Sequence, residues 1–161
     1  MATLKESSLT AIIDTREQAP FDLAKFGFGK IERKALDFGD YSIKGLESLL
    51  CIERKSLADL ILSITRTRKT MDKRISAMRG YRYAYLIIEA SASDILDHKY
   101  RGKTSELAVI GTLAKYQSCG ISVINSDNAY FAARICARLL YFVAREVYSY
   151  AHIFSHKQGG K

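Results

Sequence analysis

Short apolar runs that end in charged residues mark most of the predicted strands. Residues 9–14 (LTAIID) form one such run, which suits a buried strand that carries Asp14 at its tip. Residues 49–52 (LLCI) lead in the same way into a charged stretch, and 83–89 (YAYLIIE) are strongly apolar. Further strands are predicted at 30–36, 41–43 and 121–124, the first of them from a weak alternation.

Longer segments with apolar residues every three or four positions predict helices. One begins after Ser56, a good N-cap, and its apolar positions continue to about Arg79. Residues 104–118 predict a second helix, closed by Gly120, and a third long helix is predicted over 128–152. Because strands and helices alternate, the predicted class is α/β with a partly parallel sheet.

Length and composition suit a single folded domain. The chain has 161 residues, of which 48% are hydrophobic, enough to bury one core. We expect the domain over 9–152, with flexible termini at 1–8 and 153–161. The sequence has no run of about 18 uncharged apolar residues, so neither a membrane-spanning helix nor a membrane partner is expected.

The N-terminus and the cysteines predict an intracellular protein. The opening residues, MATLKESSLT, lack the apolar core of a signal peptide. The chain has an odd number of cysteines, which lie far apart in apolar stretches of the sequence: Cys51, Cys119 and Cys136. This favours reduced thiols over a disulfide framework. No Cys/His spacing resembles that of a zinc site.

The charge balance raises the question of a nucleic-acid partner. The net charge is +8, from 25 basic and 17 acidic residues. A basic domain of this size often binds nucleic acid, but a solvated surface with a basic bias gives the same total. Charge alone leaves these two interpretations open.

Candidate chemistry centres on Asp40, Glu53 and Lys55. A hairpin between Tyr41 and Ile52 would return Glu53 beside Asp40, which ends a turn. Glu53 and Lys55 are two residues apart on a strand and share a face. Two converging carboxylates bind a hard cation such as Mg²⁺, and the lysine can orient water or stabilise a phosphate oxygen.

The order of these motifs resembles a known nuclease family. Gly39-Asp40, then Glu53-Arg54-Lys55, with Asp59 three residues beyond Ser56, resembles the GD…ERKxxxD motif of the XPF-type structure-specific endonuclease domain. Asp14-Thr15-Arg16-Glu17 is similar to that family's early D-x-R-E element. The resemblance covers roughly residues 10–145 and is strongest to small stand-alone microbial and phage members.

The resemblance implies a restriction-endonuclease-like fold, with a central mixed β-sheet flanked by helices, and an Mg²⁺- or Mn²⁺-dependent endodeoxyribonuclease. Asp40 and Glu53 would be metal ligands, Asp14 a further ligand or a close neighbour of the ligands, and Lys55 the catalytic lysine. The supporting residues would be Arg16, Glu17, Arg54 and Asp59. The implied substrate is branched, flap or fork DNA, cut during repair, recombination or replication.

Some of these residues have plain structural alternatives. Asp59 can equally be a helix-start charge. Arg16 and Glu17 can form a surface ion pair, and Glu89 is expected to be a structural acid. Arg54 points away from Lys55 by strand alternation, so we expect a carboxylate to brace it, with Asp59 as a candidate.

The tetrapeptide Ile-Glu-Arg-Lys occurs twice, at 31–34 and at 52–55. The first copy has no preceding Gly-Asp, and Asp37 follows it after two residues and leads into a turn. We therefore interpret the first copy as a coincidental charged strand, with Glu32 and Lys34 on a solvated face.

Basic residues after the second copy predict a DNA-contacting surface that follows the phosphate backbone. The alternative is a solvated helix face. A departure from larger relatives is Asp72, near the position where they carry a glutamine. The predicted DNA-binding residues are Arg66, Arg68, Lys69, Lys73, Arg74, Arg101 and Lys103.

The last predicted helix is apolar on more than one side, which favours a homodimer face over a helix clamped between sheet and loops. Because the chain ends soon after this helix, junction recognition would come from the domain itself, from dimerisation or from another protein. Two further functions stay open: a catalytically inactive domain that binds DNA or scaffolds a partner, and an RNA-directed nuclease.

Overall fold

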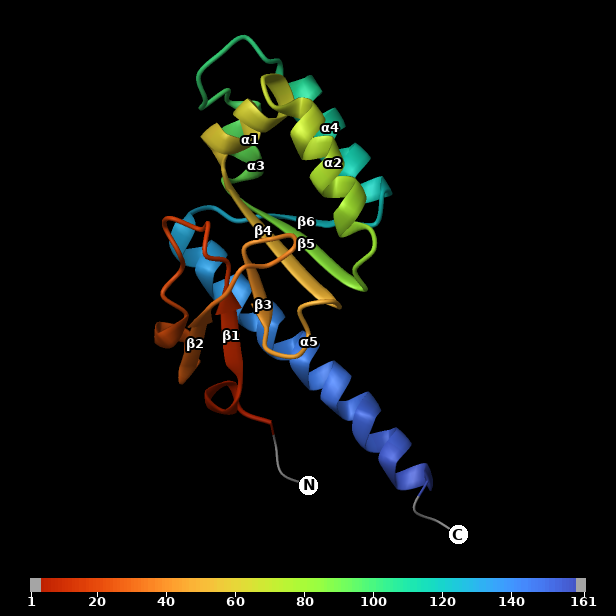
Figure 1. Ribbon diagram of the computed structural model, residues 1–161. Helices are drawn as coiled ribbons and strands as arrows, with labels where there is room; N and C mark the ends of the chain where they lie inside the picture. The colour runs from red at the N-terminus through yellow and green to blue at the C-terminus, as the bar shows by residue number, and fades with distance from the viewer. Residues whose placement is uncertain (1–3, 159–161) are drawn as a thin grey trace.

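Six strands form one mixed sheet in the computed structural model, which describes residues 4–158 (Figure 1). Their order across the sheet is β2-β1-β3-β4-β5-β6. β1 runs parallel to β2, β4 to β5 and β5 to β6, whereas β3 is antiparallel to both of its neighbours. The strands are β1 (Thr10–Ile13), β2 (Lys30–Arg33), β3 (Tyr41–Ile43), β4 (Leu50–Ser56), β5 (Tyr83–Glu89) and β6 (Ser122–Asn125).

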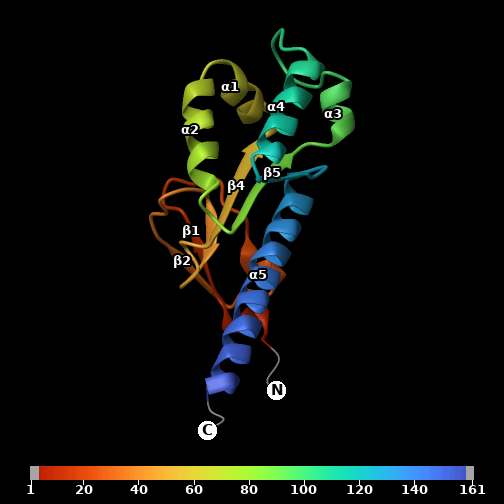
Figure 2. The same ribbon diagram turned by 90° about the vertical axis from the view of Figure 1, so that its right-hand side faces the viewer.

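Helices cover both faces of this sheet (Figures 1 and 2). α5 packs on one face against residues of β1, β3, β4 and β5. α1, α2, α3 and α4 pack on the other face, mainly against β4 and β5. The helices are α1 (Leu57–Thr65), α2 (Arg68–Met78), α3 (Ala92–Leu96), α4 (Glu106–Ser118) and α5 (Ala129–Gln158), with short 3-10 turns η1 (Glu6–Ser8) and η2 (Leu23–Phe26). The predicted α/β class, with a mixed sheet flanked by helices, is confirmed.

β4 divides its side chains between the two layers. Ile52 packs into the cluster beneath α5, while Cys51 packs among the helices of the opposite layer. Because side chains alternate along a strand, Arg54 follows Ile52 to the α5 side, and Glu53 and Lys55 face α1 and α2. The predicted separation of Arg54 from Lys55 therefore holds.

The turn before β3 lies directly against β4. The Asp40 N–H donates to the Ile52 carbonyl at 2.8 Å, and the Asp40 carbonyl accepts from the Asp14 N–H at 2.8 Å. Gly39 has φ 80°, and a Cβ there would lie 2.7 Å from the Cys51 Sγ. Only glycine combines this backbone angle with so close an approach.

The segment after Ser56 differs from its sequence prediction. One helix was expected to about Arg79, but α1 ends at Thr65 and α2 begins at Arg68. Thr67 leaves the helical region at φ −110° and ψ 28°, and this turn redirects the chain. Apolar residues keep helical spacing on both sides of the break, so the pattern alone gave no sign of it.

Smaller differences concern lengths. The strand expected over 30–36 stops at Arg33, and the short helix α3 was not predicted, since five residues are too few to show a period. The last helix was expected over 128–152 but continues to Gln158. Residues 1–3 and 159–161, parts of the predicted flexible termini, lie outside the described residues. Within 4–158, no helix has both the length and the apolar character that crossing a bilayer requires.

Replacement of Gly39 by alanine should destabilise the fold more than the same change at Gly45. Both glycines have positive φ, which costs alanine about 1 kcal/mol, but a Cβ at Gly45 would meet nothing within 4 Å. The clash with Cys51 should add about 1–3 kcal/mol to Gly39→Ala. Urea unfolding of the two variants measures the difference, and equal losses would contradict the close packing of the turn on β4.

Candidate active site

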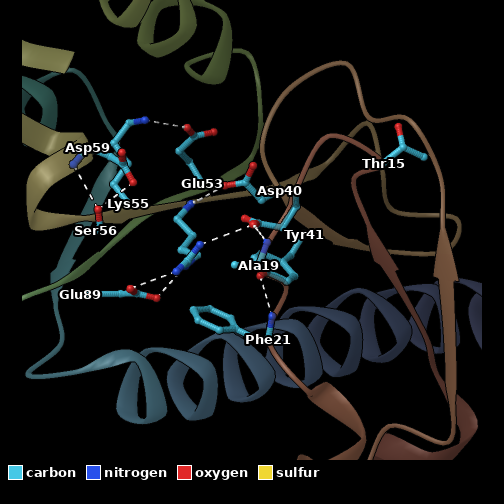
Figure 3. A network of polar contacts seen from close by, with 12 residues as sticks. Thr15, Ala19, Phe21, Asp40, Tyr41, Glu53, Lys55, Ser56, Asp59 and Glu89 are labelled. Atoms are coloured by element: carbon cyan, nitrogen blue, oxygen red, sulfur yellow. Dashed lines mark hydrogen bonds and ion pairs between the residues drawn. The ribbon is translucent and has the colours of Figure 1, made fainter. Parts of the chain in front are cut away.

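The carboxyl groups of Asp40 and Glu53 meet where the turn before β3 contacts β4 (Figure 3). The Arg54 N–H, next in the chain after Glu53, donates to the Asp40 Oδ2 at 2.7 Å. Glu53 is only 1% exposed. Its Oε2 is buried and accepts no hydrogen bond from the described residues. The hairpin therefore brings the two acids together as the sequence predicted.

The surroundings of Asp40 disfavour its ionised form. Burial, followed by the nearby Glu53 charge, raises the pKa of Asp40 from 3.8 to about 7, although the Arg54 N–H acts in the opposite direction. A buried carboxyl group next to a second carboxylate resists ionisation unless a cation offsets the repulsion.

Two cationic side chains share one oxygen of Glu53. The Lys55 Nζ lies 3.3 Å from the Glu53 Oε1, and Figure 3 shows its side chain reaching toward that carboxylate. The Arg74 guanidinium, from α2, hydrogen-bonds the same Oε1. A cavity of about 190 Å³ adjoins them between α1 and α2, lined in part by Lys55, Thr67 and Arg74. The turn at Thr67 allows Arg74 to reach β4.

This arrangement fits a divalent cation. The unpartnered Oε2 of Glu53 and the carboxyl group of Asp40 are oxygen ligands of the kind that Mg²⁺ and Mn²⁺ take, and Mg²⁺ often uses only one or two carboxylates. Among residues 4–158, no group of three or more His, Cys, Asp and Glu side chains is arranged to hold a metal ion. The acids brought together are therefore a pair.

The Asp14 backbone N–H donates to the Asp40 carbonyl, but the Asp14 carboxylate is hydrogen-bonded to residues outside the pair. Its carboxylate accepts from the Arg16 Nε at 2.8 Å and from the Leu36 N–H at 2.7 Å. Burial acts to raise the Asp14 pKa, but the hydrogen bonds from Arg16 and Leu36 outweigh it and lower the pKa to about 2. Arg16 also donates to the Leu36 carbonyl at 2.6 Å, so the two residues together join β1 to the segment after β2.

Arg54 is braced on the opposite face of the sheet, but not by the predicted partner. Its guanidinium contacts both oxygens of Glu89, at 2.6 and 3.1 Å, and the Glu17 Oε1 at 3.4 Å. It also lies over the Phe21 ring, 5.4 Å from the centroid. The expected structural role of Glu89 is thus confirmed. Its position was visible in the sequence as the acid ending the strand predicted beside β4.

Asp59 caps α1 instead of bracing Arg54. The Asp59 N–H donates to the Ser56 Oγ at 3.1 Å, and the Ser56 hydroxyl donates to the Asp59 Oδ2 at 2.7 Å. Asp59 as the partner of Arg54 was wrong, because α1 starts on the face toward which Lys55, not Arg54, points. The alternative of an Arg16–Glu17 ion pair is also wrong, since each pairs elsewhere.

The first copy of the tetrapeptide lies away from the acid pair, on the edge strand β2 and just beyond it. Glu32 pairs with Lys44 at 2.7 Å, and Lys34 pairs with Glu47 at 2.9 Å. Lys34 and Lys44 are largely exposed. This supports the interpretation of the first copy as a solvated charged strand.

The predicted DNA-binding residues divide into two groups. Arg74 contacts Glu53 and belongs to the candidate site, a contact that the sequence pattern did not indicate. Asp72 pairs with Lys115 at 3.3 Å and approaches Arg68 at 4.0 Å, so it acts within the helical layer. The remaining members are exposed: Arg66, Arg68, Lys69, Lys73, Arg101 and Lys103.

Comparisons with known proteins identify a family and a fold. A family model described as the ERCC4 domain matches residues 13–139. The fold is similar to XPF from Aeropyrum pernix, with TM-score 0.69 and 22% identity over 89% of this chain and 69% of that chain. A second structure, XPF from Aeropyrum pernix in complex with DNA, has TM-score 0.69 and 22% identity over 86% and 66% of the two chains. No curated protein sequence matches. At this identity the structural likeness establishes the fold.

The Asp14→Asn variant should lower stability in a pH-dependent way. Because the folded pKa lies near 2 and the ordinary value is 3.8, the Asp14 charge contributes about 2 kcal/mol above pH 4. That contribution is lost as the pH falls through about 2. Denaturant unfolding should therefore show a gap between Asp14→Asn and the parent protein that narrows from pH 4 to pH 2.

A matched control is Asp37→Asn, which removes an exposed carboxylate one residue after Leu36. It should change stability by less than about 0.5 kcal/mol at every pH. A gap for Asp14→Asn that stayed constant with pH would contradict the ionised, hydrogen-bonded state of Asp14.

Proposed function

The chain belongs to the ERCC4 domain family, and on that premise we propose that it is a metal-dependent endonuclease that hydrolyses phosphodiester bonds in DNA. The family expected from the sequence is confirmed by this match. The observation that carries the proposal is the pairing of the partly buried Asp40 with the fully buried Glu53, with one Glu53 oxygen unpartnered and a lysine alongside. This arrangement suits a hard cation at a phosphate.

In the proposed enzyme, Asp40 and Glu53 would hold Mg²⁺ or Mn²⁺. When bound, such an ion supplies Lewis acidity toward the scissile phosphate and the attacking water. The chain's own residues do the rest. Lys55, whose side chain is 13% exposed, presents an ammonium group beside Glu53 that can orient water or stabilise a phosphate oxygen. Arg74, less buried, can compensate the charge of the phosphate.

Further residues outside the pair position it. The Arg54 N–H holds Asp40, while the Arg54 side chain is pinned by Glu89 and Glu17 on the far face of the sheet. Asp14 links Arg16 to Leu36, and its own N–H holds the Asp40 carbonyl. We therefore assign Asp14 a positioning role, as a neighbour of the metal ligands, and Arg16 and Glu17 supporting roles.

The proposed substrate is branched, flap or fork DNA, processed in repair, recombination or replication inside the cell. Support comes from the family, from the exposed basic residues around α2, and from a structural neighbour described as a complex with DNA. We further propose a homodimer through α5. That helix leaves large apolar side chains exposed beyond those that pack on the sheet: Tyr130, Phe131, Phe142, Tyr148 and Tyr150.

Cleavage and metal binding together test the proposed activity. Labelled flap, fork and blunt duplex DNA should be cut only with Mg²⁺ or Mn²⁺, and Asp40→Asn should lower the rate at least about 100-fold because a charged ligand is lost. Mn²⁺ titration followed by electron paramagnetic resonance should show a site that Glu53→Gln removes. Glu32→Gln, the matched change in the first tetrapeptide, should leave both properties intact.

Two outcomes would contradict the proposal. Equal cutting by the parent protein and Asp40→Asn would point to a contaminating nuclease. Mn²⁺ binding without cleavage of any substrate, DNA or RNA, would indicate a scaffolding domain instead of an enzyme.

The homodimer is tested by Phe142→Glu. This side chain is 48% exposed on α5, and a carboxylate there should convert a dimer into a monomer in sedimentation equilibrium. The control is Leu107→Glu on α4, where an even more exposed apolar side chain is replaced. A dimer that survives Phe142→Glu would place the interface elsewhere.

A further inference from the structure

A groove of about 480 Å³ runs between α1 and the segment 97–104. Its lining combines apolar and basic residues. We call its apolar lining residues the floor and its basic lining residues the rim. The floor is Ala58, Ile61, Leu62 and Tyr100, and the rim is Arg66, Lys99, Arg101 and Lys103.

The groove follows one face of α1 away from the candidate active site. Ala58, Leu62 and Thr65 lie on successive turns of that face, and Arg66 follows at its end. Ala58 lies in the first turn of α1, which follows directly from β4 and Lys55. At 1.5 Å per residue, the lined face extends about 12 Å.

The opposite wall is ordered by contacts within the segment 97–104. The Tyr100 hydroxyl donates to the Thr104 carbonyl at 3.0 Å. The His98 ring lies 4.1 Å from the Tyr100 ring, and its Nε2 lies 3.1 Å from the Gly102 carbonyl. His98 itself has φ 53°, a left-handed backbone that turns the segment back on itself. Arg101 and Lys103 are thus carried on a structured loop.

Three of the rim cations are not balanced by the protein. Lys99 pairs with Asp94 at 3.0 Å and Asp97 at 3.7 Å. Within the part of the chain that the structure describes, Arg66, Arg101 and Lys103 have no ion pair, and all three are exposed. The groove therefore offers three positive charges without an ion pair beside apolar side chains.

The ligand that suits both features is an unpaired nucleotide. An apolar peptide would leave the cations without partners, and the backbone of a duplex would leave the apolar floor without contacts. An unpaired strand presents phosphates to the cations and a base face to the floor, as single-strand binding sites require. A volume of about 480 Å³ also lies in the range of small-ligand sites, roughly 300–1,000 Å³.

We infer that this groove binds an unpaired stretch of a DNA strand next to the candidate active site. The inference rests on the proposed DNA substrate, and it specifies the place on the protein where the single-stranded part of that substrate binds. Leu62 and Tyr100 contact the base, while Arg66, Arg101 and Lys103 contact phosphates. A strand in the groove would thereby hold a single-strand/double-strand junction near Lys55.

The test measures binding in EDTA, where no metal-dependent cleavage occurs, by fluorescence anisotropy of labelled oligo(dT) and of a blunt hairpin duplex. The double variant Arg101→Ala/Lys103→Ala should bind oligo(dT) about tenfold more weakly at 0.1 M salt. Its salt slope should fall by about 1.4, because each lost phosphate contact removes about 0.7 for single strands.

Leu62→Ala tests the base contact separately. Leu62 is 43% exposed, so the fold should tolerate the change. Binding of oligo(dT) should weaken about threefold to tenfold with an unchanged salt slope, and binding of the hairpin duplex should not change. The control Lys25→Ala/Lys30→Ala removes two exposed charges near β2, at the opposite edge of the sheet, and should leave the preference for oligo(dT) intact.

Two results would contradict the inferred binding of an unpaired strand in the groove. One is Leu62→Ala binding oligo(dT) as tightly as the parent protein. The other is an Arg101→Ala/Lys103→Ala variant that loses oligo(dT) and duplex binding equally, which would indicate a general phosphate-contacting surface. Because the assay needs neither metal nor cleavage, an inactive enzyme that binds oligo(dT) in this way would refute the proposed hydrolysis and leave the groove standing.

Discussion

The rest of the structure depends on one constraint: the carboxyl groups of Asp40, which is partly buried, and Glu53, which is fully buried, are held close together. Asp40 comes from a turn and Glu53 from β4. Lys55 and Arg74 both contact the Glu53 Oε1, whereas burial and the Glu53 charge raise the pKa of Asp40 and the Glu53 Oε2 has no partner among the described residues. Burial of like charges costs free energy, and stable folds retain it where function requires it. Three features hold Asp40 beside Glu53 despite this free-energy cost: the turn at Gly39, the Arg54 N–H and the Asp14 N–H.

Strand alternation on β4 places the side chains of the proposed active site on one face of the sheet and the side chain that anchors the strand on the other. Glu53 and Lys55 face α1 and α2, where Arg74 and the basic surface lie, while Arg54 is anchored to Glu89 on the face that α5 covers. A braced strand keeps Glu53 and Lys55 near one geometry, which is what the proposed catalysis would require. The break between α1 and α2 also contributes to the site, because it redirects the chain so that Arg74 on α2 contacts Glu53.

Much of this could be predicted from the sequence because its signals are local. The Gly39-Asp40 turn, the two-residue spacing of Glu53 and Lys55, and the apolar strands each need only a few neighbouring residues. The contacts of Arg54 with Glu89, of Arg74 with Glu53, and of Asp14 with Leu36 join residues far apart in the chain. No spacing rule reports such contacts, and that is why Asp59, the candidate partner of Arg54, was wrong. The groove beside α1 was hidden for the same reason, since its two walls meet only in the folded chain.

Anomalous diffraction from a crystal soaked in Mn²⁺ tests the central claim most directly. The account predicts a manganese peak between the carboxylates of Asp40 and Glu53, with the Glu53 Oε2 among its ligands and the Lys55 ammonium nearby. An occupied manganese site elsewhere, with the two carboxylates turned away from each other and no peak between them, would contradict it.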